Sequence, residues 1–175
     1  MPNPIDTIYG YVQSLTNKRD SVAMAKVMES VYPRRKKVNI TAATSLSEAT
    51  HGLGRIITVN NATGFAMTLP ASTGDGSRFR FVLGTTVTGG SMTIKVANAS
   101  DTMVGLCLMA QDGGDTSVTF GASGTDDTIT MNGTTLGGTK GDYIELEDVS
   151  LNLWSVRMFA TGTSTEASPF SATVA

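Results

Sequence analysis

The strongest constraint on the fold of this chain is an alternation of large apolar residues with polar or smaller ones. In the runs Phe65–Leu69, Arg78–Leu83 and Met92–Val96, large apolar residues occupy every second position. Because successive side chains of a β-strand point to opposite faces of its sheet, a period of two predicts strands with one buried face. The alternation begins near Val38 and therefore predicts that most of the chain folds into β-sheet.

Further apolar runs separated by turn residues extend this pattern. They predict strands over Arg55–Val59, Thr102–Met109, Thr116–Phe120, Thr128–Met131, Asp142–Glu147 and Leu151–Phe159. In the last run the apolar phase changes after Leu153, which we interpret as a β-bulge. Thr and Ser supply 42 of the 175 residues and charged residues only 16%, a composition that suits short strands and many turns. Residues 38–160 are therefore predicted to be all-β, an antiparallel β-sandwich or barrel of jelly-roll-like form.

Glycine and asparagine mark the connections between these strands. Gly89-Gly90 and Asn132-Gly133 each separate two alternating runs and predict two-residue hairpins. Longer loops are predicted over Asn60–Gly64, Gly74–Gly76, Asp112–Asp115, Gly121–Asp127 and Gly137–Gly141. The tail, 161–175, is rich in Thr, Ser and Ala; it is either loose or adds an edge strand over Phe170–Val174, on its own sheet or on a neighbour.

Residues 1–37 form a separate arm by charge and by pattern. They have seven basic and three acidic side chains, a net charge of +4, whereas residues 38–175 have a net charge of −6. Residues 18–31 are good helix formers in which Met24, Met28 and Val31 recur at helical spacing, and Pro33 ends the segment. A helix of about 14 residues is marginal alone in water, so its apolar stripe must pack either on its own domain or on a partner.

The sequence offers little support for catalysis. One Cys and one His make Cys107 and His51 the only thiol–imidazole pair, and they exclude zinc sites with several such ligands. Cys107 lies in a run that is apolar on both phases, so we interpret it as a buried, inert thiol, and His51 as a surface residue. Acidic residues in predicted loops are interpreted as solvated turn residues rather than a weak cation site: Asp112, Asp115, Asp126 and Asp127. We predict no enzyme activity, no cofactor, no metal and no membrane span.

The basic run Arg34–Lys37 is the one dense block of charge. Such a run could contact nucleic-acid phosphates, but it is only four residues long and no aromatic residues are interleaved with it. We therefore favour contact with an acidic protein surface, or a solvated linker, and expect no nucleic-acid partner.

Two adjoining stretches resemble virion proteins of tailed bacteriophages. In the first, Ile56–Ala71, a strand ends in Thr-Leu-Pro-Ala; in the second, Gly76–Thr86, an Arg-Phe-x-Phe strand ends in Gly-Thr. The pattern is similar to the β-domain of head decoration (cement) proteins and of related head or tail appendage proteins. This resemblance implies a β-domain without catalytic residues, located on the outer surface of the capsid as a homotrimer bound to the major capsid protein.

The charge division and the resemblance together predict a capsid-stabilising protein that grips the head with its arm. Modest contacts from several arms of one oligomer would add up to nearly irreversible attachment. The predicted capsid-binding residues are Lys18, Arg19, Met24, Val27, Met28, Val31, Arg34, Arg35, Lys36 and Lys37. The alternative is a fibre or spike appendage that binds a host receptor or glycan, which would require exposed aromatic or acidic surface. Trp154 and Tyr143 lie within predicted strands.

Overall fold

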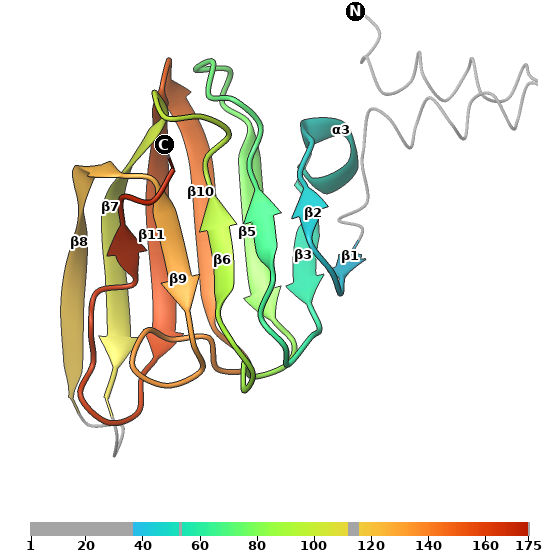
Figure 1. The fold of residues 1–175 in the computed structure, drawn as a ribbon. Coiled ribbons are helices and arrows are strands. Elements are labelled where there is room, and N and C mark those ends of the chain that lie inside the picture. Colours follow the sequence, from blue (N-terminus) through green and yellow to red (C-terminus); the bar gives the residue numbers. More distant parts are fainter. Residues whose placement is uncertain (1–36, 53, 112–115, 175) are drawn as a thin grey trace, which may run out of the picture. The chain divides into compact units, whose positions relative to one another are not determined.

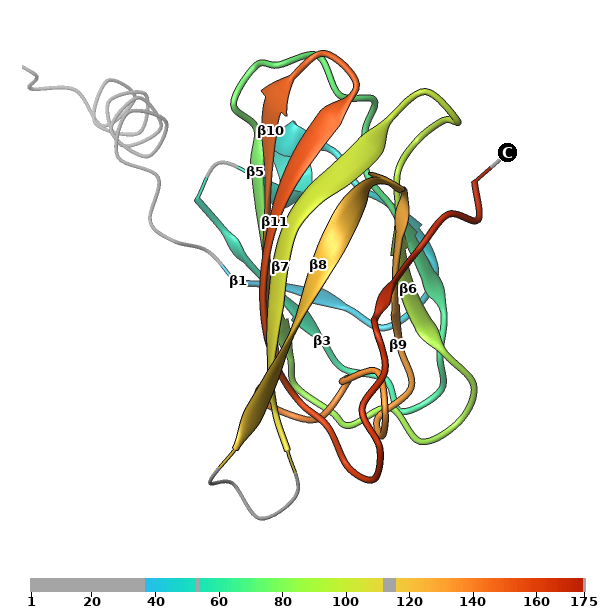
Figure 2. The same ribbon diagram turned by 90° about the vertical axis from the view of Figure 1, so that its left-hand side faces the viewer.

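Two β-sheets pack face to face in the computed structural model, which describes residues 37–52, 54–111 and 116–174 (Figure 1). Seen from the side, they form the two layers of a sandwich (Figure 2). The larger sheet has the strand order β1-β3-β5-β10-β11-β7-β8, and the smaller has the order β12-β9-β6-β4-β2. The all-β sandwich predicted from the alternation is therefore confirmed.

The larger sheet contains β1 (Lys37–Ile40), β3 (Ile56–Val59), β5 (Arg78–Leu83), β7 (Thr102–Ala110), β8 (Ser117–Asp126), β10 (Tyr143–Ser150) and β11 (Leu153–Thr161). The smaller sheet contains β2 (Thr44–Ser45), β4 (Ala66–Thr68), β6 (Met92–Lys95), β9 (Thr128–Met131) and β12 (Phe170–Ser171). One short helix, α3 (Glu48–His51), follows β2. The strands β1 and β2 and this helix were not predicted.

The first half of the chain winds between the two sheets. From β1 to β7 the chain changes sheet after every strand, and each of β3 to β6 lies beside the strand two positions earlier and runs in the same direction. The pairs β1-β3, β3-β5, β2-β4 and β4-β6 are accordingly parallel. Hairpins appear only later among the described strands, as the antiparallel pairs β7-β8 and β10-β11. Both sheets are therefore mixed rather than purely antiparallel.

This winding explains why the two predicted glycine hairpins are wrong. Gly89-Gly90 joins β5 to β6 and Asn132-Gly133 joins β9 to β10, and in both cases the two strands belong to different sheets. A turn signal in the sequence reports the local backbone, here a positive φ at Gly90 and Gly133, but it does not report which strands pair. The true hairpin turn between β10 and β11 contains Asn152, with φ 64°.

Two other connections also differ from the predictions. Gly121–Asp127 is not a loop, because β8 continues to Asp126, paired with β7 across a register shift between Met103 and Val104. The phase change at Leu153 has its origin on the opposite strand, where the register of β10 shifts between Asp148 and Ser150. Leu151 belongs to the turn and is 70% exposed, which explains why it is out of phase with β11.

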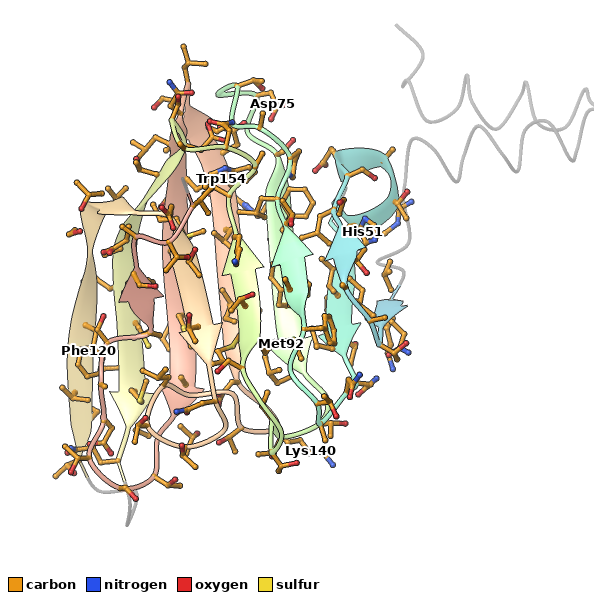
Figure 3. The ribbon with its side chains drawn as sticks, viewed as in Figure 1. His51, Asp75, Met92, Phe120, Lys140 and Trp154 are labelled. Carbon is orange, nitrogen blue, oxygen red and sulfur yellow. The ribbon has the colours of Figure 1, made fainter. Side chains whose placement is uncertain are left out.

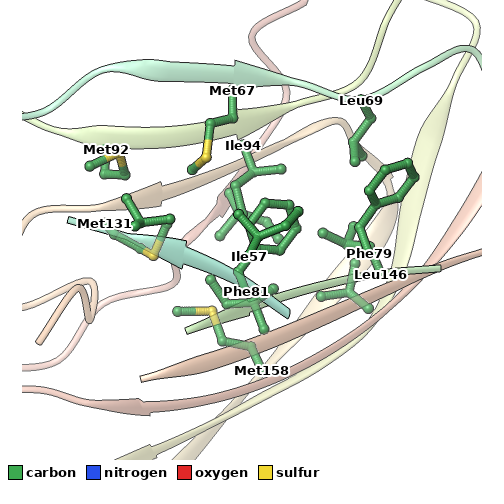
Figure 4. Close-up of a cluster of buried hydrophobic side chains, with 14 of the residues drawn as sticks. Ile57, Met67, Leu69, Phe79, Phe81, Met92, Ile94, Met131, Leu146 and Met158 are labelled. Atoms are coloured by element: carbon green, nitrogen blue, oxygen red, sulfur yellow. The ribbon is translucent and has the colours of Figure 1, made fainter. Parts of the chain in front are cut away.

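The space between the sheets is filled by the apolar phase of nearly every strand (Figure 4). Phe79 and Phe81 of β5 are fully buried, and the ring of Trp154 lies 5.8 Å from that of Phe79 between centroids. All six methionines of residues 38–175 are buried there: Met67, Met92, Met103, Met109, Met131 and Met158. Flexible thioether side chains fill irregular gaps between two sheets of unequal width. The β-domain thus has a core of its own.

The predicted domain boundaries can be compared only in part. Lys37 is the first residue of β1 and thus belongs to the β-domain rather than to the arm. The predicted helix over 18–31 lies outside the described residues. Of the two states predicted for the tail, the edge strand is found: β12 pairs with β9 of its own sheet.

Asp127 holds this tail in place and is not the solvated turn residue that was predicted. Its carboxylate is buried and accepts hydrogen bonds from the backbone N–H groups of Thr173 (2.8 Å) and Val174 (3.1 Å) and from the hydroxyl of Thr128 (2.7 Å). Burial alone would raise the pKa of Asp127, but these hydrogen bonds outweigh it and the pKa is lowered.

We expect the substitution Asp127→Ala to release the tail, because it leaves two backbone donors and one hydroxyl without their acceptor. The free energy of unfolding should fall by about 2 kcal/mol or more, measured by urea denaturation. Hydrogen exchange at residues 168–174 should accelerate. The matched control is Asp126→Ala, since within the described residues the Asp126 carboxylate accepts hydrogen bonds from Ser123 of the same strand, β8, and none from the tail. Unchanged exchange in the tail of the Asp127 variant would contradict the assignment.

Candidate interaction surface on the larger sheet

The face of the larger sheet turned away from the smaller sheet is here called the outer face. The strand registers place alternate residues of β5, β10, β11 and β7 side by side on it. One row across these strands is Arg80, Glu145, Arg157 and Leu106, and the next is Val82, Tyr143, Phe159 and Leu108. Charged side chains therefore lie mainly over β5 and β10, and exposed apolar side chains lie over β7 and β11.

An ion-pair cluster, the Arg–Glu cluster, occupies the charged half of the outer face. Glu145 lies at its centre: one carboxylate oxygen is 2.9 Å from Nε of Arg80, and the other is 3.3 Å from a terminal nitrogen of Arg157. Arg78 lies 2.6 Å from Glu147 and 3.9 Å from Glu145. These five side chains bring three positive and two negative charges together within residues 38–175, whose net charge is −6.

The environment of Glu145 keeps it ionised. Partial burial alone would raise its pKa, but hydrogen bonds from the Tyr143 hydroxyl (2.8 Å) and from Arg80, together with the positive charges of Arg80 and Arg78, lower it. The pKa of Tyr143 is raised, first by burial and then by its hydrogen bond to Glu145. At neutral pH this part of the surface therefore has fixed charges and a protonated tyrosine.

An apolar groove of about 500 Å³ lies beside the cluster. Its lining includes Leu106 and Leu108 of β7 and Phe159 of β11, which are 58%, 42% and 54% exposed. Leu106 pairs with Gly121 of β8. Because glycine has no side chain, no wall of the groove rises above β8 at this position. Large apolar side chains with such exposure, bordered by charges, are typical of a surface that contacts another molecule.

The sequence contains a sign of this groove, the apolar residues on both phases of β7, but this pattern did not lead to its prediction. The run Met103–Met109 is apolar on both phases, and from this pattern only Cys107 was predicted to be buried. In the structure one phase, Met103, Cys107 and Met109, is buried, while Leu106 and Leu108 are exposed on the outer face. Phe159 has the same phase as Arg157 and is exposed with it. A strand that is apolar on both phases can belong either to a covered sheet or to an exposed binding face, and the sequence does not distinguish the two.

Nine of the ten predicted arm residues, Lys18 to Lys36, lie outside the described residues, so the structure does not test their role. Lys37, the tenth, is exposed at the start of β1. It begins the strand at one edge of the larger sheet, whereas the apolar groove lies over β7 and β11 near the other edge. The structure therefore does not bring Lys37 together with the outer-face residues.

The thiol–imidazole pair considered for catalysis does not assemble. Cys107 is fully buried on β7, and burial, together with the charge of Asp142, raises its pKa to about 12, so the thiol is inert as predicted. The prediction of a surface His51 is wrong: it is 9% exposed, and its Nδ1 accepts the backbone N–H of Ser47. Helix α3 contacts β5, which is separated from β7 by β10 and β11, so the two side chains are held apart.

Buried aspartates bind the ends of strands to the connections around them. Asp148 accepts hydrogen bonds from the Ser72 hydroxyl and from the N–H groups of Thr73 and Gly74. Asp142 accepts three backbone N–H groups, yet burial dominates and raises its pKa. Across the described ranges, no group of three or more His, Cys, Asp or Glu side chains has an arrangement that could hold a metal ion. No helix among these residues is long and apolar enough to cross a membrane.

Comparisons with known proteins give no match. The chain matches no protein-family model, no curated protein and no solved structure.

We expect Glu145→Gln to weaken the Arg–Glu cluster in a pH-dependent way. Because the pKa of Glu145 is lowered on folding, its contribution to stability is present above the unfolded value of about 4.3 and is lost as the pH falls through the folded value. Urea denaturation at pH 7 should show a loss of about 1 kcal/mol, and the difference from the unmodified protein should shrink at pH 3. Glu147→Gln, which affects only the pair with Arg78, is the control. An equal loss at both pH values would contradict the electrostatic assignment.

Proposed function

We propose that this chain is a bacteriophage capsid decoration (cement) protein, which binds the outer surface of the mature head and stabilises contacts between major capsid protein subunits. The observation that supports this most directly is the division of the chain into two parts. A β-domain with its own core begins at Lys37, and a basic N-terminal segment precedes it. The core identified in the described domain is made of residues after this segment.

The chemistry of the N-terminal segment suits a protein partner. Its apolar stripe, Met24, Val27, Met28 and Val31, would contribute roughly 1.5–3 kcal/mol per side chain on burial, before the cost of ordering the chain. The basic residues would attract an acidic capsid surface and accelerate capture at low ionic strength. The remaining predicted contacts are Lys18, Arg19, Arg34, Arg35, Lys36 and Lys37.

The described β-domain is consistent with a structural role. Its outer face offers exposed apolar side chains next to fixed charges, as protein–protein contacts do. Association of several copies would make attachment multivalent, so that moderate single-arm affinities combine into slow release. The resemblance to decoration proteins implies three copies, but attachment through the N-terminal segment requires only that several copies associate. The proposal involves no catalytic residue and no cofactor.

Deletion of residues 1–36 tests the proposal. We expect residues 37–175 to stay folded, as judged by circular dichroism and urea denaturation, because the core lies within them. Binding to purified mature heads that lack this protein, measured by co-sedimentation, should be lost. Replacing Arg34, Arg35 and Lys36 by Gln should slow capture at low salt, whereas Lys95→Gln with Lys140→Gln in the β-domain should not. A truncated protein that binds heads with unchanged affinity would refute the arm mechanism.

One observation favours a second candidate function, a fibre or spike domain that binds host glycans. On the outer face the rings of Tyr143 and Phe159 lie 6.4 Å apart between centroids, next to Glu145 and Arg157. Binding sites for small ligands commonly combine such apolar rings with a few placed polar groups.

A glycan array distinguishes this candidate. If the outer face binds sugars, the full chain should bind a defined set of glycans, and Phe159→Ala should remove that binding with little change in stability, since Phe159 is 54% exposed. Leu151→Ala, an exposed apolar residue at the β10–β11 turn, is the matched control. An array without binding above background would eliminate the candidate.

A further inference from the structure

Among the strands that the structure describes, the edge strand β8 has an open hydrogen-bonding edge. It is the last strand of the larger sheet and, within the described residues, pairs only with β7. In an antiparallel ladder, alternate residues direct their N–H and C=O groups away from the paired neighbour. Proteins usually block such an edge with lysine, proline or a covering segment. Over its ten residues β8 contains no Lys, Arg or Pro, and its one charged residue is Asp126 at the end.

The inner side of β8 is incompletely covered. Val118, Phe120 and Ala122 face the core but are only partly buried, because the smaller sheet ends at β12, which has two residues. Figure 3 shows Phe120 at this margin of the sandwich. On the other side of β8, Thr119 lines the apolar groove with Leu106 and Leu108. Within the described residues, β8 therefore combines unpaired backbone with a partly exposed apolar inner side, and on its outer side Thr119 borders the groove.

The opposite edge of the same sheet is different. Strand β1 has four residues and begins with the exposed Lys37. Its Asn39 side chain accepts a hydrogen bond from Asn60 of the neighbouring connection. A short, polar edge of this kind resists pairing with another strand, which leaves β8 as the edge suited to an interface.

We propose that β8 pairs antiparallel with β8 of a second copy of this chain, so that two larger sheets join into one continuous sheet across a two-fold axis. In a two-fold contact a strand meets its own copy, and a charged residue near the axis would face its own like charge. From Ser117 to Thr125 the strand carries no charge at all. Residues 38–175 have a net charge of −6, and an uncharged edge lets two copies meet without placing like charges at the contact.

This pairing would cover the unpaired backbone edge and the partly exposed apolar side chains of β8 in each copy. The free backbone groups of β8 would be satisfied, and the partly exposed Phe120 would gain a neighbour from across the axis. The apolar grooves of the two copies would lie on either side of the new junction. Chains would associate in pairs instead of the threes implied by the resemblance to decoration proteins, which makes the number of copies a direct readout.

The experiment combines measurements of molecular mass with hydrogen exchange, both on the full chain. Native mass spectrometry and light scattering over a concentration series should give a species of twice 18.3 kDa. Backbone amides of Ser117–Ser123 should become more protected as the concentration rises. Thr119→Lys, which places a positive charge on each side of the axis, should weaken the dimer about tenfold or more at low ionic strength.

The control variant is Thr93→Lys, a like substitution on the interior strand β6 of the smaller sheet, which should leave the dimer unchanged. Circular dichroism and urea denaturation check that both variants fold. A monomer at all concentrations, a trimer, or a dimer in which β8 exchanges as fast as in the monomer would overturn the proposal. The outcome is independent of head binding, which is tested through residues 1–36: either result can fail while the other holds.

Discussion

A sheet of seven strands and a sheet of five cannot cover each other completely, and the structure follows from that mismatch. Burial of apolar surface between the sheets drives the packing, and the centre of the sandwich, around Phe79, Phe81 and Trp154, is fully dry. Toward β8 the cover becomes thin, and Phe120 stays partly exposed. The surface features that invite partners, the β8 edge and the outer-face groove, both lie on the wider sheet, away from this dry centre.

Acidic side chains in this domain hold structure in two ways. Inside, Asp127, Asp142 and Asp148 accept backbone N–H groups from loops and tail. These hydrogen bonds outweigh burial at Asp127, whereas burial dominates at Asp142. On the outer face, Glu145 links Arg80 and Arg157 across three strands. Such charges are fixed by several partners at once, so they stiffen the ends and one face of the sandwich while the core stays apolar.

These features fit a protein that acts by binding. A stiff sandwich with its own core can present an N-terminal segment to a large assembly without any change in fold. The exposed apolar surface of the outer face suits contact with a further partner, and the free edge of β8 suits a second copy. If the proposals hold, one chain would attach through its basic segment, associate through β8, and keep the outer face for a third contact.

The sequence by itself determined the class of fold, most of the strands and the buried faces, because a period of two depends only on which side of a strand meets water. It also placed Cys107 in the core. Sheet membership, parallel pairing and the failure of the Gly89-Gly90 hairpin were decided by the tertiary structure, since local turn signals do not record which sheet the next strand joins. The same holds for the buried Asp127 and His51 and for the exposed Leu106 and Leu108: whether a residue is covered depends on a strand distant in the sequence, and only the packing of the two sheets supplies it.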